Sequence, residues 1–145
     1  MKTALGKVLA GALAFLLLAA ASPPLEADAD TAQARYARAS AAMVAKGYRQ
    51  TRFEDLEKVA EGRAIVYPVV LERNVKYALF AAKDENIDTL ELVITPEEGN
   101  NILARSTAGD WGASLFFVPP STGLYKAYVR NTKGRDGFYL AAIAF

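Results

Sequence analysis

Two groups of side chains in this sequence are of types that can bind a ligand. The first is acidic: Asp84, Glu85 and Asp88 lie close together in one short polar stretch. Carboxylate oxygens are the hard ligands that calcium prefers, so these three side chains are candidate metal ligands. Their spacing matches no defined calcium loop, and a solvated turn is the alternative interpretation.

The second group is Trp111 with its neighbour Asp110, both in a predicted loop. An indole beside a carboxylate can stack on a sugar ring and accept hydrogen bonds from its hydroxyl groups. We therefore consider Trp111 and Asp110 candidate ligand-binding residues, with Tyr67 or Tyr128 as additional aromatic contacts. The alternative interpretation is that Trp111 only covers the end of a hydrophobic core.

The residue types that are absent limit the chemistry. The chain contains no histidine and no cysteine. Ser-His-Asp and Cys-His catalysis, the usual histidine-based zinc sites and disulfides are therefore excluded. No pair of carboxylates stands out by its spacing. We expect no enzymatic activity and no cofactor other than calcium, and the formal net charge of +1 gives no reason to expect a nucleic-acid partner.

The first residues predict export. Lys2 and Lys7 precede a largely apolar run, which is followed by two prolines and then by small residues. This order is typical of a secretory signal peptide, which we assign to residues 1–29. Cleavage after Ala29 fits best, while a cut after Ala27 or nearer Ala21 is the alternative. We therefore expect a periplasmic or secreted protein.

Residues 30–48 are predicted to contain an amphipathic helix, because residues 31–46 are rich in alanine and lack proline and glycine. Asp30 or Thr31 is the expected N-cap, and Gly47 the expected left-handed C-cap. Two faces are predicted. The apolar face comprises Tyr36, Ala37, Ala41, Met43 and Val44. The basic stripe comprises Arg35, Arg38 and Lys46, which we interpret as a solvated face, with contact to an anionic membrane surface as the weaker reading.

Residues 49–145 are predicted to form a single β-sandwich domain. From residue 65 onward, apolar and polar residues alternate in short runs that are separated by Gly, Pro and Asn turns. The stretch DTLELVITPEEGNNILA is a typical hairpin, with Leu90, Leu92 and Ile94 facing the core and Glu91 facing outward. Some positions on the outward phase are nevertheless apolar: Phe80, Val93, Phe116, Val118, Tyr128, Phe138 and Leu140. We expect the N-terminal helix to cover them, with a partner protein as the alternative cover.

The succession VVLERNVKYALFAA, DTLELVITPEEGNNILA, LFFVPPSTGLYKAYV and GFYLAAIAF resembles the bacterial pre-peptidase C-terminal domain. The resemblance covers residues 62–145 and includes a P-x-T-G-x-Y corner formed by Pro120, Thr122, Gly123 and Tyr125. It implies an all-β, antiparallel jelly-roll-like β-sandwich, here preceded by an N-terminal α-helix. In the corner, Gly123 suits a positive φ, and the Tyr125 hydroxyl is expected to reach the backbone.

Together these observations predict an exported, non-catalytic binding or interaction module of the cell envelope, with an envelope protein or a glycan as its partner. We expect it to be a monomer. One alternative is a module that binds a small ligand, either carbohydrate or calcium. The other is a small β protein associated with the outer membrane.

Overall fold

The computed structural model describes residues 28–108 and 110–145. The predicted signal peptide, residues 1–29, therefore lies outside the described residues except for Asp28 and Ala29. The helix α2 (Ala29–Ala45) comes first in the described chain. The strands that follow are β1 (Thr51–Val59), β2 (Ala64–Leu71), β3 (Tyr77–Lys83), β4 (Ile87–Pro96), β5 (Ala104–Ala108), β6 (Gly112–Phe117), β7 (Gly123–Gly134) and β8 (Gly137–Ala144).

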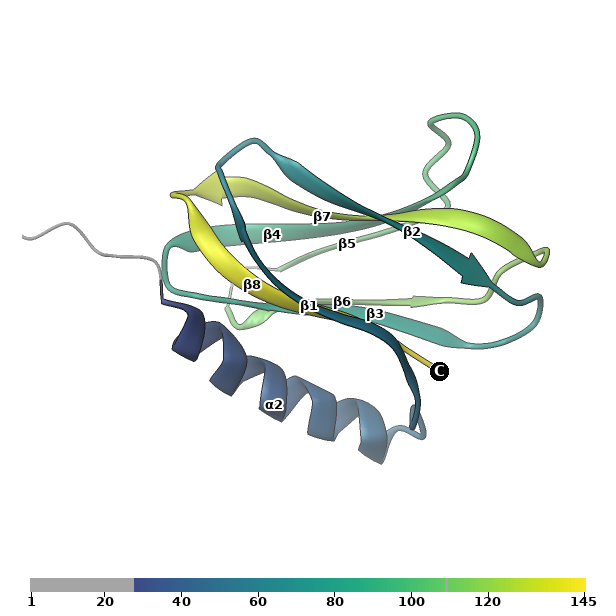
Figure 1. The fold of residues 1–145 in the computed structure, drawn as a ribbon, viewed down its shortest axis with the longest axis horizontal. Coiled ribbons are helices and arrows are strands. Elements are labelled where there is room, and N and C mark those ends of the chain that lie inside the picture. Colours follow the sequence, from purple (N-terminus) through teal and green to yellow (C-terminus); the bar gives the residue numbers. More distant parts are fainter. Residues whose placement is uncertain (1–27, 109) are drawn as a thin grey trace, which may run out of the picture.

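The strands form two antiparallel sheets in the orders β1-β8-β3-β6 and β2-β7-β4-β5, which face each other as two layers (Figure 1). Except at the β4–β5 hairpin, each strand is followed by a strand of the opposite sheet. Eight antiparallel strands that alternate between two sheets in this order form two Greek keys, which is the arrangement of a jelly roll. The predicted all-β fold class, an antiparallel jelly-roll-like sandwich preceded by a helix, is confirmed.

The core lies between the two sheets and follows the predicted alternation. Leu90 and Leu92 are fully buried and Ile94 is 1% exposed. Glu91 lies on the outer side, where its carboxylate pairs with Arg105 of β5 and Arg130 of β7. Burying three aliphatic side chains on one face provides about 5–9 kcal/mol of transfer free energy, which holds this hairpin in register.

The polar connector after the helix forms β1, which pairs with β8 from Thr51 to Val59. The corner before β7 is partly as predicted. Tyr125 is 4% exposed, and its hydroxyl donates a hydrogen bond to the Ser121 carbonyl at 2.6 Å. Gly123, in contrast, does not have the predicted positive φ, and a Cβ there would meet no atom within 4 Å.

The helix begins earlier than predicted. Its N-cap is Asp28, whose carboxylate accepts hydrogen bonds from the main-chain N–H groups of Asp30 and Thr31. The predicted caps at Asp30 or Thr31 are therefore wrong, because those two residues supply the N–H groups that Asp28 caps. The predicted C-terminal end is confirmed, since Gly47 follows the last turn with a φ of 100°.

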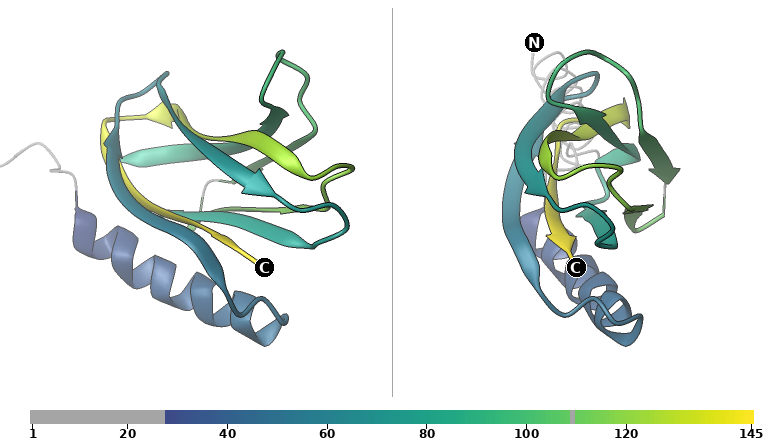
Figure 2. Two further views of the ribbon diagram at one scale, coloured as in Figure 1. Left: turned by 45° about the vertical axis from the view of Figure 1, so that its right-hand side comes forward. Right: turned by 90° about the vertical axis from the view of Figure 1, so that its right-hand side faces the viewer.

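The helix packs across the outer face of the β1-β8-β3-β6 sheet (Figure 2). The buried side of the helix comprises Ala32, Tyr36, Ala39 and Met43. The ring of Tyr36 stacks on that of Phe80 with centroids 5.4 Å apart. The predicted apolar face is right for Tyr36 and Met43 but wrong for Ala37, Ala41 and Val44, which are exposed. The two large side chains set the orientation, because an alanine fits either face.

The helix covers only part of the outward apolar set. Phe80 is buried beneath it, and Leu140 packs against the same cluster. Val93 and Tyr128 lie on the outer face of the other sheet, where the helix does not reach. Phe116 and Val118 remain 48% and 49% exposed at one end of the molecule. The prediction that one helix covers the whole set is therefore wrong, because the set is divided between two sheets.

The part of the chain that the structure describes contains no helix with both the length and the apolar character of a membrane span.

Candidate functional site

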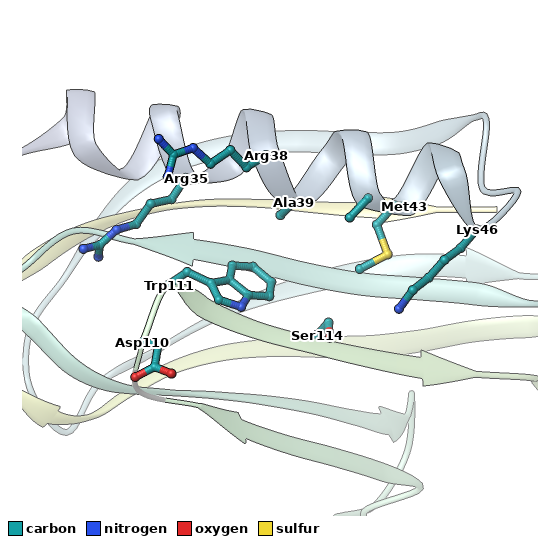
Figure 3. A pocket seen from close by; sticks show the side chains of 9 residues that line it. Arg35, Arg38, Ala39, Met43, Lys46, Asp110, Trp111 and Ser114 are labelled. Carbon is teal, nitrogen blue, oxygen red and sulfur yellow. The ribbon is translucent and has the colours of Figure 1, made fainter.

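A groove of about 580 Å³ lies between α2 and the edge strand β6 (Figure 3). Ligand pockets in proteins typically have volumes of about 300–1,000 Å³, so the groove is large enough for a small ligand or a short chain segment. The helix lines it with Arg35, Arg38, Ala39, Ala42, Met43 and Lys46. Successive members of this series are three or one residues apart, which places all of them along one side of the helix.

The sheet lines the opposite wall with Asp110, Trp111 and Ser114. The backbone here is held close to β3. The N–H of Lys83 donates to the carbonyl of Trp111 at 2.9 Å. A Cβ on the next residue, Gly112, would lie 1.9 Å from the Ala81 carbonyl oxygen, so only glycine fits. This close approach fixes the position from which the indole enters the groove.

Trp111 is partly buried and packs against the apolar cluster of Tyr36, Ala39 and Met43 beneath the helix. Figure 3 shows its indole below the helix, between the helix and β6, with Lys46 reaching down at the other end of the groove. Trp111 thus contributes both to the apolar cluster and to the groove wall, and ligand binding through its indole stays a prediction. One part of the ring covers the cluster between helix and sheet, and another part lines the groove.

The other two predicted aromatic contacts do not lie near Trp111. The hydroxyl of Tyr67 donates to the Asp55 carboxylate at 2.7 Å, while Tyr128 lines a separate hollow on the opposite sheet. The pairing of Trp111 with either tyrosine is therefore wrong. Asp110 is placed as predicted, exposed beside the indole.

The basic stripe of the helix contributes directly to the groove. Sequence reasoning placed Arg35, Arg38 and Lys46 opposite the apolar face, but the true buried side is rotated so that the stripe borders it. Consequently the stripe lines the helix side of the groove that Trp111 lines from the sheet. The i, i+3 and i+11 spacing was visible in the sequence, but the side on which the helix docks was not.

Arg35 is already engaged at one end of the groove. Its guanidinium donates to the Lys83 carbonyl at 3.0 Å and pairs with the carboxylate of Glu85. The side chain of Arg35 is 22% exposed, so it ties the helix to the turn after β3. Burial lowers the pKa of the nearby Lys83 ammonium, and the charge of Arg35 lowers it further.

The side chains of the three acidic residues do not converge on a common site. Asp84 is fully buried, Glu85 pairs with Arg35, and Asp88 is exposed. A solvated turn is therefore the wrong description of Asp84. Within residues 28–108 and 110–145, no three acidic side chains are grouped so as to hold a metal ion. Calcium binding at these three residues stays a prediction.

The carboxylate of Asp84 instead accepts four hydrogen bonds from main-chain N–H groups. Its Oδ1 accepts from the main-chain N–H groups of Asn86 and Ile87, at 3.0 and 3.3 Å. Its Oδ2 accepts from those of Phe138 and Asp28, at 2.9 and 3.0 Å. One side chain thus joins the β3–β4 turn, the start of β8 and the start of the helix. Because all of these hydrogen bonds are made within the protein, we assign the carboxylate of Asp84 a role in stabilising the fold.

A second hollow, of about 280 Å³, lies on the outer face of the β2-β7-β4-β5 sheet. Its lining includes Val93, Ile102, Arg105, Tyr128 and Arg130. Both arginines are paired with Glu91, so the hollow offers less unpaired charge than the groove does. We therefore consider the groove the stronger candidate site.

The two-sheet jelly roll with a helix on one outer face defines the class of fold. No family model matches the sequence, and no curated protein is similar to it. Among solved structures, the chain resembles the pre-peptidase C-terminal domain of a collagenase from Bacillus anthracis. The TM-score is 0.54 and the identity 18%, over 63% of this chain and 87% of that one.

The chain also resembles PliG from Aeromonas hydrophila, a periplasmic lysozyme inhibitor of g-type lysozyme. That likeness has a TM-score of 0.53 and an identity of 14%, and it covers 68% of this chain and 88% of the inhibitor. The predicted resemblance to the pre-peptidase C-terminal domain is confirmed at the level of the fold. At these identities the likeness concerns the fold alone.

Proposed function

We propose that this chain is an exported, non-catalytic binding module of the cell envelope, and that the groove between α2 and β6 is its binding site. The charged and apolar order of residues 1–29 supports export. The fold is shared with a periplasmic inhibitor and with a pre-peptidase C-terminal domain, which supports a binding role of the same general kind. The absence of histidine and cysteine from the sequence supports a non-catalytic one.

The observation that carries the proposal is the joining of two features that are far apart in the sequence. Trp111 and Asp110, on the β6 side, line the same groove as Arg38 and Lys46 of the helix. A concave surface that combines an aromatic ring with a few charged groups is typical of a ligand site.

Affinity capture with matched variants tests the site. The tagged mature protein is incubated with an extract of cell envelopes, and the bound proteins and glycans are analysed. Ala42 lines the groove and its neighbour Ala41 does not, while both are exposed on the helix. We expect Ala42→Glu to lose the captured molecule and Ala41→Glu to retain it. Equal capture by both variants would show that the groove is not the binding site.

Export is tested separately, by fractionating cells that express the full chain. We expect the protein in the periplasm or the medium, shortened by the mass of the signal peptide. A full-length chain that stays in the cytoplasm would contradict this part of the proposal.

A protein partner on the opposite sheet is the second candidate function. Five large apolar side chains are exposed on or beside the β2-β7-β4-β5 sheet: Val66, Val70, Ile102, Leu103 and Leu124. Exposed apolar patches are typical of protein interaction sites. We expect the isolated protein to be a monomer in light scattering, with this face available. Crosslinking from Val70→Cys, in a chain that has no other cysteine, would identify the partner.

A further inference from the structure

The two ends of the groove carry positive charge that the rest of the described chain does not neutralise. Arg38 and Lys46 line the groove eight residues apart, which corresponds to about 12 Å along a helix. Neither forms an ion pair among the described residues. The Lys46 ammonium lies 4.8 Å from the centroid of the Phe116 ring, which holds it at its end of the groove.

Between these two cations the wall changes character. The indole of Trp111 lies beside the thioether of Met43 and the methyl group of Ala39, and it offers a flat apolar surface (Figure 3). Next to it, Asp110 provides hydrogen-bond acceptors and Ser114 provides both a donor and an acceptor. The ligand should therefore have an apolar face, hydroxyl groups that donate to a carboxylate, and negative charges spaced along its length.

We infer that the groove binds an acidic saccharide, with Trp111 stacked against one sugar ring and Arg38 and Lys46 paired with carboxylate or phosphate groups on either side. This inference rests on the proposed function and specifies its ligand. A sugar ring has a flat face of C–H bonds for the indole and hydroxyl groups for Asp110. A peptide of acidic residues alone matches the two cations equally well, but its side chains supply neither hydroxyl donors for Asp110 nor a rigid flat face.

The single tryptophan makes the test direct, because all indole fluorescence of the protein comes from Trp111. The mature protein is titrated with a trimer of galacturonic acid, with a phosphorylated glucosamine disaccharide, with the methyl-esterified trimer and with a short poly-glutamate peptide. We expect at least one acidic sugar to quench or shift the emission. The neutral trimer should bind at least about tenfold more weakly than the acidic one. Added salt should weaken the binding of the acidic sugar, because it screens the charges.

Charge-removing variants test whether Arg38 and Lys46 bind the acidic groups of the sugar, with calorimetry as the second readout. Arg38→Gln and Lys46→Gln should each weaken the acidic sugar about fivefold, and together about 25-fold, as expected for partly exposed ion pairs. Arg49→Gln is the matched control, since Arg49 is exposed just beyond the helix and does not line the groove. It should leave binding unchanged.

Three results would overturn the inference. They are equal affinity for the neutral and acidic trimers, tighter binding of poly-glutamate than of either acidic sugar, and no response to any probe. In each case the capture experiment with Ala42→Glu and Ala41→Glu still decides whether the groove binds some other molecule. Failure of the saccharide assignment and failure of the proposed function are therefore distinguishable.

Discussion

The main-chain N–H of Asp28 donates a hydrogen bond to Oδ2 of Asp84 at 3.0 Å, across a separation of 56 residues. Asp28 also caps the helix with its own carboxylate. The same two residues therefore define where the helix begins and where that beginning is attached to the sandwich. Because one wall of the groove is the helix, the attachment also bears on the geometry of the candidate site.

Replacing Asp84 with asparagine should destabilise the protein strongly. The amide nitrogen of asparagine cannot accept hydrogen bonds, so two of the four N–H groups that now bind the carboxylate would lose their acceptor. Leaving buried donors unsatisfied costs about 1–3 kcal/mol each, and we expect a loss of about 3 kcal/mol in the free energy of unfolding. Urea denaturation followed by circular dichroism measures it.

The matched control for this change is Asp88→Asn. Asp88 belongs to the same acidic cluster but is exposed, and no side-chain hydrogen bond is found for it within the described residues. The control should stay within about 0.5 kcal/mol of the wild type, as surface substitutions usually do. If both variants behaved alike, the structural role assigned to Asp84 would be wrong.

The position of the signal-peptide cut has a measurable consequence. A chain that begins at Asp30 lacks the Asp28 cap and the donor to Asp84, and it places a new ammonium group at the positive end of the helix. We expect its Tm to be lower than that of a chain beginning at Asp28. On this ground we favour the alternative cut after Ala27 over the cut after Ala29 that fits the sequence best, and N-terminal sequencing of the exported protein should then show Asp28 as its first residue. An exported chain that starts at Asp30 without loss of Tm would contradict this.

Much of the fold was predictable because strand and turn signals are local. Leu90, Leu92 and Ile94 alternate with polar neighbours over one strand, and the burial of one face follows directly. The side of the helix that is buried was less predictable. Nearly half of the helix positions are alanine, which fits a surface or a core, so the large side chains Tyr36 and Met43 decide the orientation.

The candidate site was predictable only in its parts. Trp111 and Asp110 stand out by residue type, and so does the basic stripe of the helix. Their meeting depends on how the helix docks on the β1-β8-β3-β6 sheet, and this long-range packing leaves no mark in a local pattern. For the same reason the four donors to Asp84 were not foreseen, since they come from three separate segments.

Alkaline pH should destabilise the protein through its buried tyrosines. Burial raises the pKa of Tyr67 above the ordinary 10.0, and hydrogen bonds with Tyr139 and Asp55 raise it further. Burial also raises the pKa of Tyr139. Above pH 10 the unfolded chain therefore loses phenolic protons that the folded chain keeps. The unfolded state then binds fewer protons, so the free energy of unfolding falls as pH rises.

Tyr67→Phe tests this explanation. The variant loses the hydrogen bonds with Asp55 and with the buried Tyr139 hydroxyl, which together should cost about 2–3 kcal/mol at neutral pH. It should also make the alkaline decline less steep, since one of the groups with a raised pKa is gone. Urea midpoints measured at several pH values, together with the absorbance of tyrosinate, report both effects. An unchanged alkaline slope would assign the decline to other groups.

Gly112 should be the glycine on which the candidate site depends most. An alanine there would place its Cβ 1.9 Å from the Ala81 carbonyl oxygen, so β6 would have to move away from β3. We expect Gly112→Ala to destabilise the protein by about 3 kcal/mol, at the upper end for overpacking, and to shift the emission of the adjacent Trp111. Gly123→Ala is the matched control, because a Cβ at that strand position meets no atom within 4 Å and φ is not positive. It should leave both Tm and emission nearly unchanged. A Gly112→Ala protein with wild-type emission would show that the indole is not positioned by the close approach of β6 to β3.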